Sequence, residues 1–292
     1  MDDDKRVKFD FEVDFSNGGG IQGQDFRLDV AGDDIGDGTL ADYIVRDMRL
    51  LMVGDVRILN KEIIEERHKR TIPARPRRGI VDVSHEVEEG MVTYKGIPAP
   101  IMCDFLSREE SKSRYEGDTE FHIGRIDMVA NTGTYVDSPF HRFADGKDLS
   151  ELPLESLADL DTVVVRAADR QGVDRDAFER LDVAGKAVLV HTGWDTNWRT
   201  DRYFEGHPFL TGEAAEYLVE AGAAIVGIDS HNIDDAEDGY RPVHTKLLGA
   251  DIPIVEHMTG LENLPDNGAR FFAVPVKVKD FGTFPVRAFG LV

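Results

Sequence analysis

The sequence has a single cysteine, Cys103, among 292 residues, which excludes an internal disulfide. No run approaches the roughly 18 consecutive apolar residues that a membrane-spanning helix needs. The amino terminus, MDDDKRVKFDF, also lacks the apolar core of a secretory signal. These absences predict a cytoplasmic protein that does not enter a membrane.

Basic side chains are also scarce, with 34 Lys and Arg against 56 Asp and Glu and a net charge of -22. Binding to nucleic acid or to an anionic lipid surface requires a basic face, so neither is expected as a partner. Apolar residues still make up 41% of the chain, which is enough for a sizeable core at this length. The composition therefore predicts a globular protein of one large domain or two unequal ones.

Residues 1–75 are predicted to form a small α/β module, whose role the sequence does not reveal. FDFEVDF (9–15) alternates apolar and acidic residues as a strand does, and NGGG (17–20) is typical of a turn. TLADYIVRDMRLLMVG predicts a helix from Leu40 to Met52 that ends at Gly54. VRILN predicts a short strand, KEIIEERHKR a charged helix, and TIPARPRRG (71–79), with two prolines, a linker.

Residues 76–292 have a different sequence pattern, in which short β-branched runs alternate with helical segments. The runs GIVDVSHEV, TVVVRAA, AVLVHTGW, AAIVGIDS, IPIVEH and FFAVPVKV predict strands. TGEAAEYLVEAG (211–222) predicts a helix ended by Gly222, and it leads directly into a strand. The predicted class is α/β, in its mixed α+β form. Cys103 lies in the apolar stretch APIMCDFL and is expected to be a buried structural thiol.

The segment VANTGTYVDSPFHR (129–142) carries the clearest candidate site. Read as an extended chain, it places Asn131, Tyr135, Asp137 and His141 on one face, with Gly133 among them. An amide, a phenol, a carboxylate and an imidazole on one face indicate a site rather than a solvated edge. Asn131 and Tyr135, however, stand where a metal enzyme would use stronger ligands.

Several of these segments together resemble the cyclase family, whose members include bacterial kynurenine formamidases and isatin hydrolases. The likeness runs through VDVSHEVEEGMVTY, TGTYVDSPFHRFADG, HTGWDTNW, VHTKLLGADIPIVEH and FFAVPVKVKDFGTFPVRAFG. The resemblance implies a swivelling β/β/α-type domain over residues 76–292. It also implies a metal-dependent hydrolase that acts on a small formamide, cyclic amide or lactone, assembled as a homodimer or homotetramer.

The family signature, His-x-Gly-Thr-His-x-Asp-x-Pro-x-His, assigns roles residue by residue. Its two first-metal histidines are replaced here by Asn131 and Tyr135, whereas its bridging carboxylate is matched by Asp137. Its closing histidine, the proton donor and acceptor, is matched by His141. Downstream, the second-metal histidine and the carboxylate shared by both metals are matched by His244 and Glu256. The resemblance thus implies a divergent member in which one metal site has lost both nitrogen ligands.

One imidazole and two carboxylates suit a single divalent ion, zinc or manganese, with positions left open for water and substrate. Histidine changes its charge near neutral pH, which suits the proton transfer expected of His141. Tyr135 is expected either to ionise and ligate the metal or to hydrogen-bond the Asp137 carboxylate. Other side chains expected to contact the substrate or to orient the ligands are Asn131, Trp194, Asp229 and His85.

Three functions remain open from the sequence. The first is the metal-dependent hydrolase. The second is a degenerate member that binds a small molecule, or serves as an assembly subunit, without hydrolysis. The third is a metal-free cyclase or lyase that uses Tyr135 and His141 as an acid and base pair. The loss of both first-metal histidines keeps the last two open, whereas retention of the remaining site residues favours chemistry.

Overall fold

The computed structural model describes residues 5–30, 32, 34–65 and 79–292. The chain divides into two compact units, Met1–Arg77 and Arg78–Val292. Within the described ranges no helix has both the length and the apolar character to cross a bilayer. The linker predicted at 71–79 lies outside the described residues, except for Gly79.

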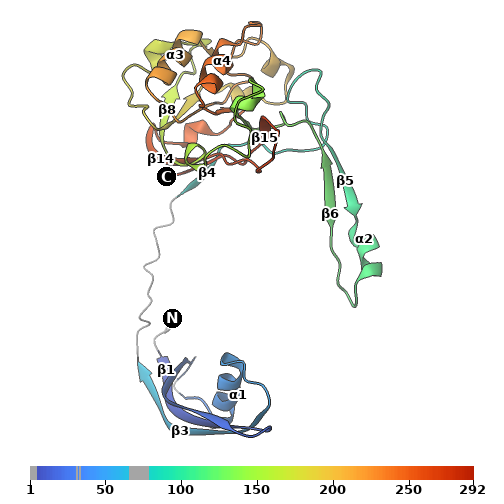
Figure 1. Ribbon diagram of the computed structural model, residues 1–292, viewed down its shortest axis with the longest axis vertical. Coiled ribbons are helices and arrows are strands. Elements are labelled where there is room, and N and C mark those ends of the chain that lie inside the picture. Colours follow the sequence, from blue (N-terminus) through green and yellow to red (C-terminus); the bar gives the residue numbers. More distant parts are fainter. Residues whose placement is uncertain (1–4, 31, 33, 66–78) are drawn as a thin grey trace. The chain divides into compact units, whose positions relative to one another are not determined.

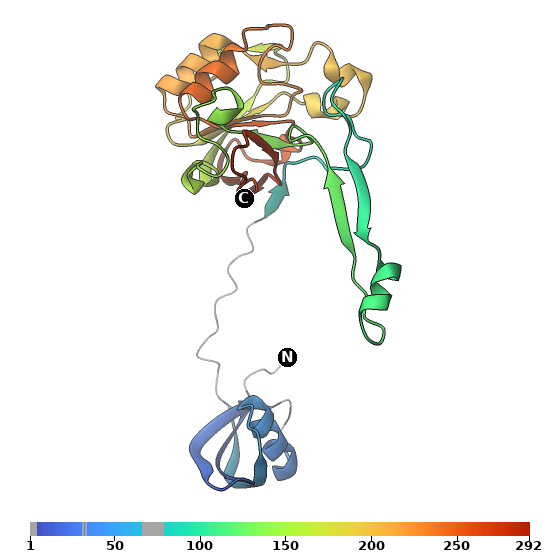
Figure 2. The same ribbon diagram turned by 45° about the vertical axis from the view of Figure 1, so that its right-hand side comes forward.

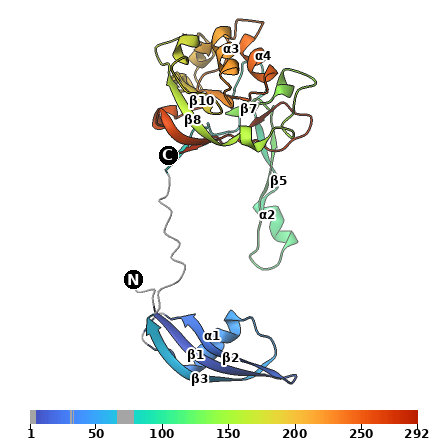
Figure 3. The same cartoon turned by 60° about the vertical axis from the view of Figure 1, so that its left-hand side comes forward.

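Unit 1 is a three-stranded antiparallel sheet in the order β2-β1-β3, accompanied by one helix (Figure 3). The elements are β1 Lys5–Phe15, β2 Gly20–Asp29, α1 Asp37–Asp47 and β3 Val53–Glu65. Alternate residues of β1 are buried and form a core with Leu40 and Ile44 of α1: Val7, Phe9, Phe11 and Val13. Charged residues occupy the intervening positions of β1, which is the period of a sheet with one covered face.

Two predictions for unit 1 are wrong. The helix ends at Asp47 rather than near Met52, because Arg49 and Met52 adopt left-handed backbone angles of 52° and 58° that reverse the chain. Gly54 then lies within β3. The predicted helix KEIIEERHKR is strand as far as Glu65, since Ile63 pairs with Val7 of β1. Residues 66–70 lie outside the described part of the chain.

Unit 2 is built on a nine-stranded mixed sheet in the order β15-β7-β13-β12-β10-β8-β14-β16-β4 (Figure 1). Its central strands, β8 Ala158–Arg166, β10 Ala187–His191, β12 Ile225–Ile228 and β13 Ile254–Glu256, run parallel. The outer strands, which pair antiparallel, are β4 Ile80–Asp82, β7 Tyr135–Asp137, β14 Asn267–Phe272, β15 Thr283–Pro285 and β16 Phe289–Leu291. A separate parallel pair consists of β9 Gly172–Val173 and β11 Phe209–Leu210.

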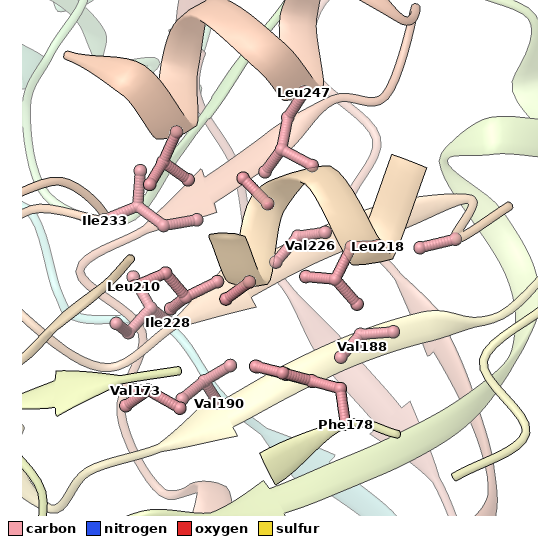
Figure 4. Packing of buried hydrophobic residues seen from close by; sticks show 14 of the residues in the cluster. Val173, Phe178, Val188, Val190, Leu210, Leu218, Val226, Ile228, Ile233 and Leu247 are labelled. Carbon is pink, nitrogen blue, oxygen red and sulfur yellow. The ribbon is translucent and has the colours of Figure 1, made fainter. Parts of the chain in front are cut away.

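Buried apolar side chains form two core clusters in unit 2. In the first, strand residues such as Val190 and Ile228 pack against Leu218 of α3 (Gly212–Glu220) and Leu247 of α4 (Pro242–Gly249), as Figure 4 shows. The second cluster lies on the other face of the sheet and includes Val136, Leu189 and Val255. The residues directly before and after each of them in its strand point to the opposite face. Seven short 3-10 helices connect these elements: η1 Lys112–Arg114, η2 Pro139–His141, η3 Leu154–Ser156, η4 Arg175–Ala177, η5 Trp194–Asn197, η6 Asp201–Phe204 and η7 Leu261–Asn263.

The prediction of a mixed α/β fold is confirmed by this sheet and its helices. The predicted helix at 211–222 is α3, where the Thr211 hydroxyl accepts a hydrogen bond from the Ala214 amide and Gly222 follows with φ +76°. The strand predicted from FFAVPVKV is shorter than expected and ends at Phe272. Pro275 lacks the amide hydrogen that would continue the ladder.

A long β-hairpin projects from the rest of unit 2 (Figures 1 and 2). Its strands, β5 Ile101–Leu106 and β6 Ile123–Asp127, pair only with each other, and α2 Arg108–Ser111 lies near its tip. The prediction that Cys103 is buried is wrong: the residue lies on β5 and is exposed. Among the described residues of unit 2 no further layer covers this two-stranded hairpin, so the apolar character of APIMCDFL does not lead to burial.

Candidate functional site

Three adjacent strands at one edge of the sheet set the direction of the candidate side chains. Tyr135 of β7 pairs with Glu256 of β13, and Asp137 pairs with Thr283 of β15. Directly opposed residues share a face of the sheet, as do residues two apart along a strand. Tyr135, Asp137, Glu256 and Thr283 therefore face the same side, whereas Val136 enters the second core cluster.

The extended chain on which the one-face prediction rested covers only Tyr135–Asp137. Asn131 precedes it in a loop and His141 follows it in η2. Nevertheless these residues gather around one cavity of about 440 Å³, a volume suited to a small ligand. Its lining consists of Tyr94, Ile97, Asn131, Tyr135, His141, Arg142, Asn232, Gly239, Tyr240, Arg241, His244 and Glu256.

His244 enters the cavity from α4, and Asp234 holds its ring. The His244 Nδ1 atom lies 2.6 Å from Asp234 Oδ2, and the backbone amides of Val243 and His244 donate to the same carboxylate at 2.7 and 3.0 Å. A carboxylate accepts these bonds, so Nδ1 is the donor. The Nε2 atom is left 3.8 Å from Asp137 Oδ2 and 3.7 Å from Glu256 Oε1.

Asp137 is fully buried, and its two carboxylate oxygens differ in their hydrogen bonding. Oδ1 accepts a hydrogen bond from the Thr283 hydroxyl, whose Oγ1 atom also lies 2.9 Å from His141 Nδ1. Oδ2 has no hydrogen-bond partner among the described residues. A buried carboxylate oxygen without a donor is costly unless a cation is beside it.

The donor set fits a divalent cation. One ligand atom from each of Asp137, His141 and His244 lies within 4.8 Å of the others. This group includes His141 in addition to two of the ligands predicted from the sequence, while Glu256 stands beside His244. Imidazole nitrogen and carboxylate oxygen are the ligands that zinc and manganese share.

Positive charge is favoured at this point of the cavity. Burial lowers the pKa of His244, but the Glu256, Asp137 and Asp234 carboxylates outweigh burial and raise it to about 10. The same carboxylates would stabilise a bound cation next to a neutral imidazole. The three carboxylates therefore stabilise a positive charge here, whether it is a protonated His244 or a metal ion.

Tyr135 donates a hydrogen bond from its hydroxyl to Glu256 Oε2 at 2.6 Å. The sequence had instead suggested the Asp137 carboxylate as the acceptor. The register accounts for the difference, because Tyr135 stands opposite Glu256. The Tyr94 hydroxyl lies 3.2 Å from the same Oε2 atom and 2.9 Å from the Tyr135 hydroxyl. Burial and the Glu256 charge raise the pKa of Tyr135 well above its usual value, so the phenol is neutral and acts as a donor.

Four of the predicted site residues do not line this cavity. One is Asp137, which is fully buried beside His244. The other three serve elsewhere. Trp194 Nε1 donates to the Tyr203 carbonyl at 3.0 Å. Asp229 accepts from the amides of Thr192 and Gly193, and so holds the turn after β10. His85 stacks on Trp198, with ring centroids 4.1 Å apart and planes 6° apart. These side chains fix loops around the sheet.

Several residues that the fold brings to the cavity or behind it were not predicted from the sequence. Tyr94 is the last residue of VDVSHEVEEGMVTY, and its place in this segment of family resemblance was the only sequence feature that pointed to it. Asp234 stands in the acidic run IDDAED, where nothing distinguished it from its neighbours. The others are Arg142, Asn232, Arg241 and Thr283.

The fold has clear counterparts in known proteins. Kynurenine formamidase of Bacillus anthracis is 25% identical over 210 residues, which cover 71% of this chain and 95% of that enzyme. A potential metal-dependent hydrolase with cyclase activity superposes with a TM-score of 0.60 at 26% identity, covering 73% of this chain and 96% of its own. Isatin hydrolase A of Labrenzia aggregata shares the fold, with a TM-score of 0.62 at 21% identity over 73% of this chain and 93% of its own.

These relatives are hydrolases by name, and the prediction of a hydrolase is confirmed. The similarity to a potential metal-dependent hydrolase and the group of Asp137, His141 and His244 together indicate a divalent metal ion. The family model described as "Putative cyclase" matches residues 81–235, which are 155 of the 292 residues. The chain belongs to the putative cyclase family.

Proposed function

We propose that the protein hydrolyses an amide bond of a small molecule, with one divalent ion held by Asp137, His244 and Glu256. The observation that carries the proposal is the position of His244 Nε2, which has Asp137 Oδ2 and Glu256 Oε1 at 3.8 and 3.7 Å. This donor set suits zinc or manganese and leaves coordination positions open. When bound, such an ion supplies Lewis-acid activation of a carbonyl group and of water. The kynurenine formamidase relatives support an amide as the bond that is cleaved.

The hydroxyl groups around Glu256 support a single ion. The family signature has histidines at the positions of Asn131 and Tyr135, which would hold the other metal. Here Glu256 Oε2 is instead engaged by the hydroxyls of Tyr135 and Tyr94. A second ion bound there would have to displace both donors, and positions 131 and 135 would offer it no imidazole.

His141 is the group that we assign to proton transfer. Its side chain is 36% exposed and lines the cavity, while Nδ1 lies 2.9 Å from the Thr283 hydroxyl. This contact fixes the ring and leaves Nε2 for proton exchange with a molecule in the cavity. Transfer of a proton to the departing amine is the step that cleavage of an amide requires of such a group.

The test combines elemental analysis of protein purified without added metal with hydrolysis of formanilide and of the formamide of kynurenine. We expect one ion per chain, and we expect chelation to abolish turnover and either zinc or manganese to restore it. His141→Ala should keep the ion and lower turnover by roughly two to four powers of ten, the usual contribution of a general acid or base. Protein that neither binds a divalent ion nor hydrolyses either amide after metal loading would refute the proposal.

A further inference from the structure

Two arginines line the cavity beside the candidate metal ligands. Arg142 directly follows His141, and Arg241 is the residue from which α4 begins, three positions before His244. Arg142 Nε donates to the hydroxyl of Thr245, in the first turn of the same helix, at 3.3 Å. The Arg142 guanidinium thus contacts the first turn of α4, and the backbone of Arg241 leads into the same turn, which carries His244.

The polar partners of both arginines within the described ranges are uncharged oxygens. Arg142 bonds the Thr245 hydroxyl, and its guanidinium lies 5.2 Å from the centre of the Phe143 ring. Arg241 bonds the Asn232 side-chain oxygen at 3.1 Å and the carbonyl oxygens of residues 235 and 236. Elsewhere in this acidic chain arginines pair with carboxylates, as Arg175 does with Glu179.

Arg241 is held in position by a chain of hydrogen bonds that reaches the metal ligands. Its Asn232 partner donates to the Tyr94 hydroxyl at 3.0 Å, and Tyr94 in turn donates to Glu256. A guanidinium that is already oriented loses little conformational freedom when it binds a planar anion. Arg241 is thus preorganised toward the cavity.

Neither arginine forms an ion pair with a carboxylate among the described residues, and the charges around the cavity leave an excess of positive charge. The negative charges of Asp137 and Glu256 match a divalent ion, and the buried Asp234 carboxylate offsets one of the two guanidinium groups, so one positive charge remains uncompensated. A ligand that carries a carboxylate would supply the missing negative charge, because guanidinium binds carboxylate through charge-assisted hydrogen bonds. Tyr240, which is 89% exposed, and Ile97 line the same cavity and offer apolar surface to the remainder of such a ligand.

We propose that Arg142 and Arg241 form a subsite for a carboxylate group of the substrate, so that the protein prefers amides that bear a carboxylate. This inference rests on the proposed function, because it assigns the subsite to the substrate of that reaction. Arg142 and Arg241 would bind and orient the amide, whereas the residues described above would cleave it.

The test uses two amides of equal size, 2-formamidobenzoate and 2-formamidobenzamide, which differ in one negative charge. The wild-type protein should favour the carboxylate in kcat/KM by roughly ten- to a hundredfold, the range expected for a charge-assisted hydrogen bond. Arg142→Gln and Arg241→Gln should raise KM for the carboxylate and bring the preference toward one. Arg142→Lys should retain part of it, because the charge remains. Arg180→Gln, at an exposed arginine outside the cavity, is the matched control and should keep the wild-type preference.

Equilibrium binding separates this subsite from the proposed function. Hydrolysis of both amides with equal efficiency would overturn the subsite and leave the proposed function standing. If neither amide is hydrolysed, calorimetry with the same two compounds decides: tighter binding of the carboxylate that Arg142→Gln removes supports the subsite, and equal binding overturns it. Arg241→Gln also removes hydrogen bonds to the loop at 235–236, so Arg142→Gln carries the test if the Arg241 variant does not fold.

Discussion

Replacing Asp234 by asparagine tests how the candidate metal ligand His244 is held. The Asp234 carboxylate accepts three hydrogen bonds, from His244 Nδ1 at 2.6 Å and from the amides of His244 and Val243 at 3.0 and 2.7 Å. Asparagine has the same shape, but one of its terminal atoms is a donor and it carries no charge, so at least one of these bonds is lost.

The expected effect is a weaker metal site in a folded protein. Loss of the carboxylate that orients a ligating histidine typically lowers metal affinity by roughly ten- to a hundredfold. That factor corresponds to about 1.4 to 2.7 kcal/mol of binding free energy. Asp137→Ala, in contrast, removes a ligand outright and should abolish metal binding, because one imidazole and one carboxylate compete poorly with water.

The assay is competition for zinc between the protein and a chelator of known affinity, with circular dichroism as the check on folding. Asp235→Asn is the matched control, since it removes the same charge one residue away, where Oδ1 accepts from the Glu237 amide. The control should bind zinc as the wild type does. A folded Asp234→Asn protein with wild-type zinc affinity would refute the reasoning, because His244 would then not be a ligand held by Asp234.

Three further results are expected. Asn131→His combined with Tyr135→His should raise the metal content by a second ion per chain, because it restores both signature histidines and removes a hydroxyl from Glu256; unchanged content in elemental analysis would contradict this. Burial lowers the pKa of His231 to about 3, below its unfolded value of about 6.5. The contribution of neutral His231 to the free energy of unfolding is therefore fully present above pH 6.5 and decreases as the pH falls below that value. Urea unfolding should therefore register a loss of roughly 2 kcal/mol from this histidine between pH 6.5 and 5, and His231→Phe should lessen the pH dependence; an equally steep dependence in the variant would argue against it. We also expect the β5–β6 hairpin to pack on a second copy of the chain, since a bare two-stranded hairpin is marginal in water and Phe105 is 69% exposed. Phe105→Asp with Ile126→Asp should then reduce the mass measured by light scattering, whereas Leu154→Asp, at an exposed leucine outside the hairpin, should not; a monomeric wild type would contradict the prediction.

Local pattern determined much of the fold from the sequence by itself. The β-branched runs TVVVRAA, AVLVHTGW and AAIVGIDS overlap β8, β10 and β12, because their side chains suit a sheet that is covered on both faces. Thr211 and Gly222 bound α3, since a hydroxyl cap and a left-handed glycine act within one helical turn. Each of these signals depends only on residues close together in the chain.

Tertiary structure decided the features that depend on distant partners. Lys61–Glu65 is strand because β1 supplies its hydrogen bonds, against the helical preference of its Lys and Glu residues. Cys103 is exposed because β5 pairs with β6 alone among the strands that the structure describes. Tyr135 donates to Glu256 rather than to Asp137, because β7 pairs with β13 in the one register that opposes these two residues. Hydrogen-bond partners across a sheet are set by strand register, and the packing of the whole unit fixes that register, so no local pattern could reveal them.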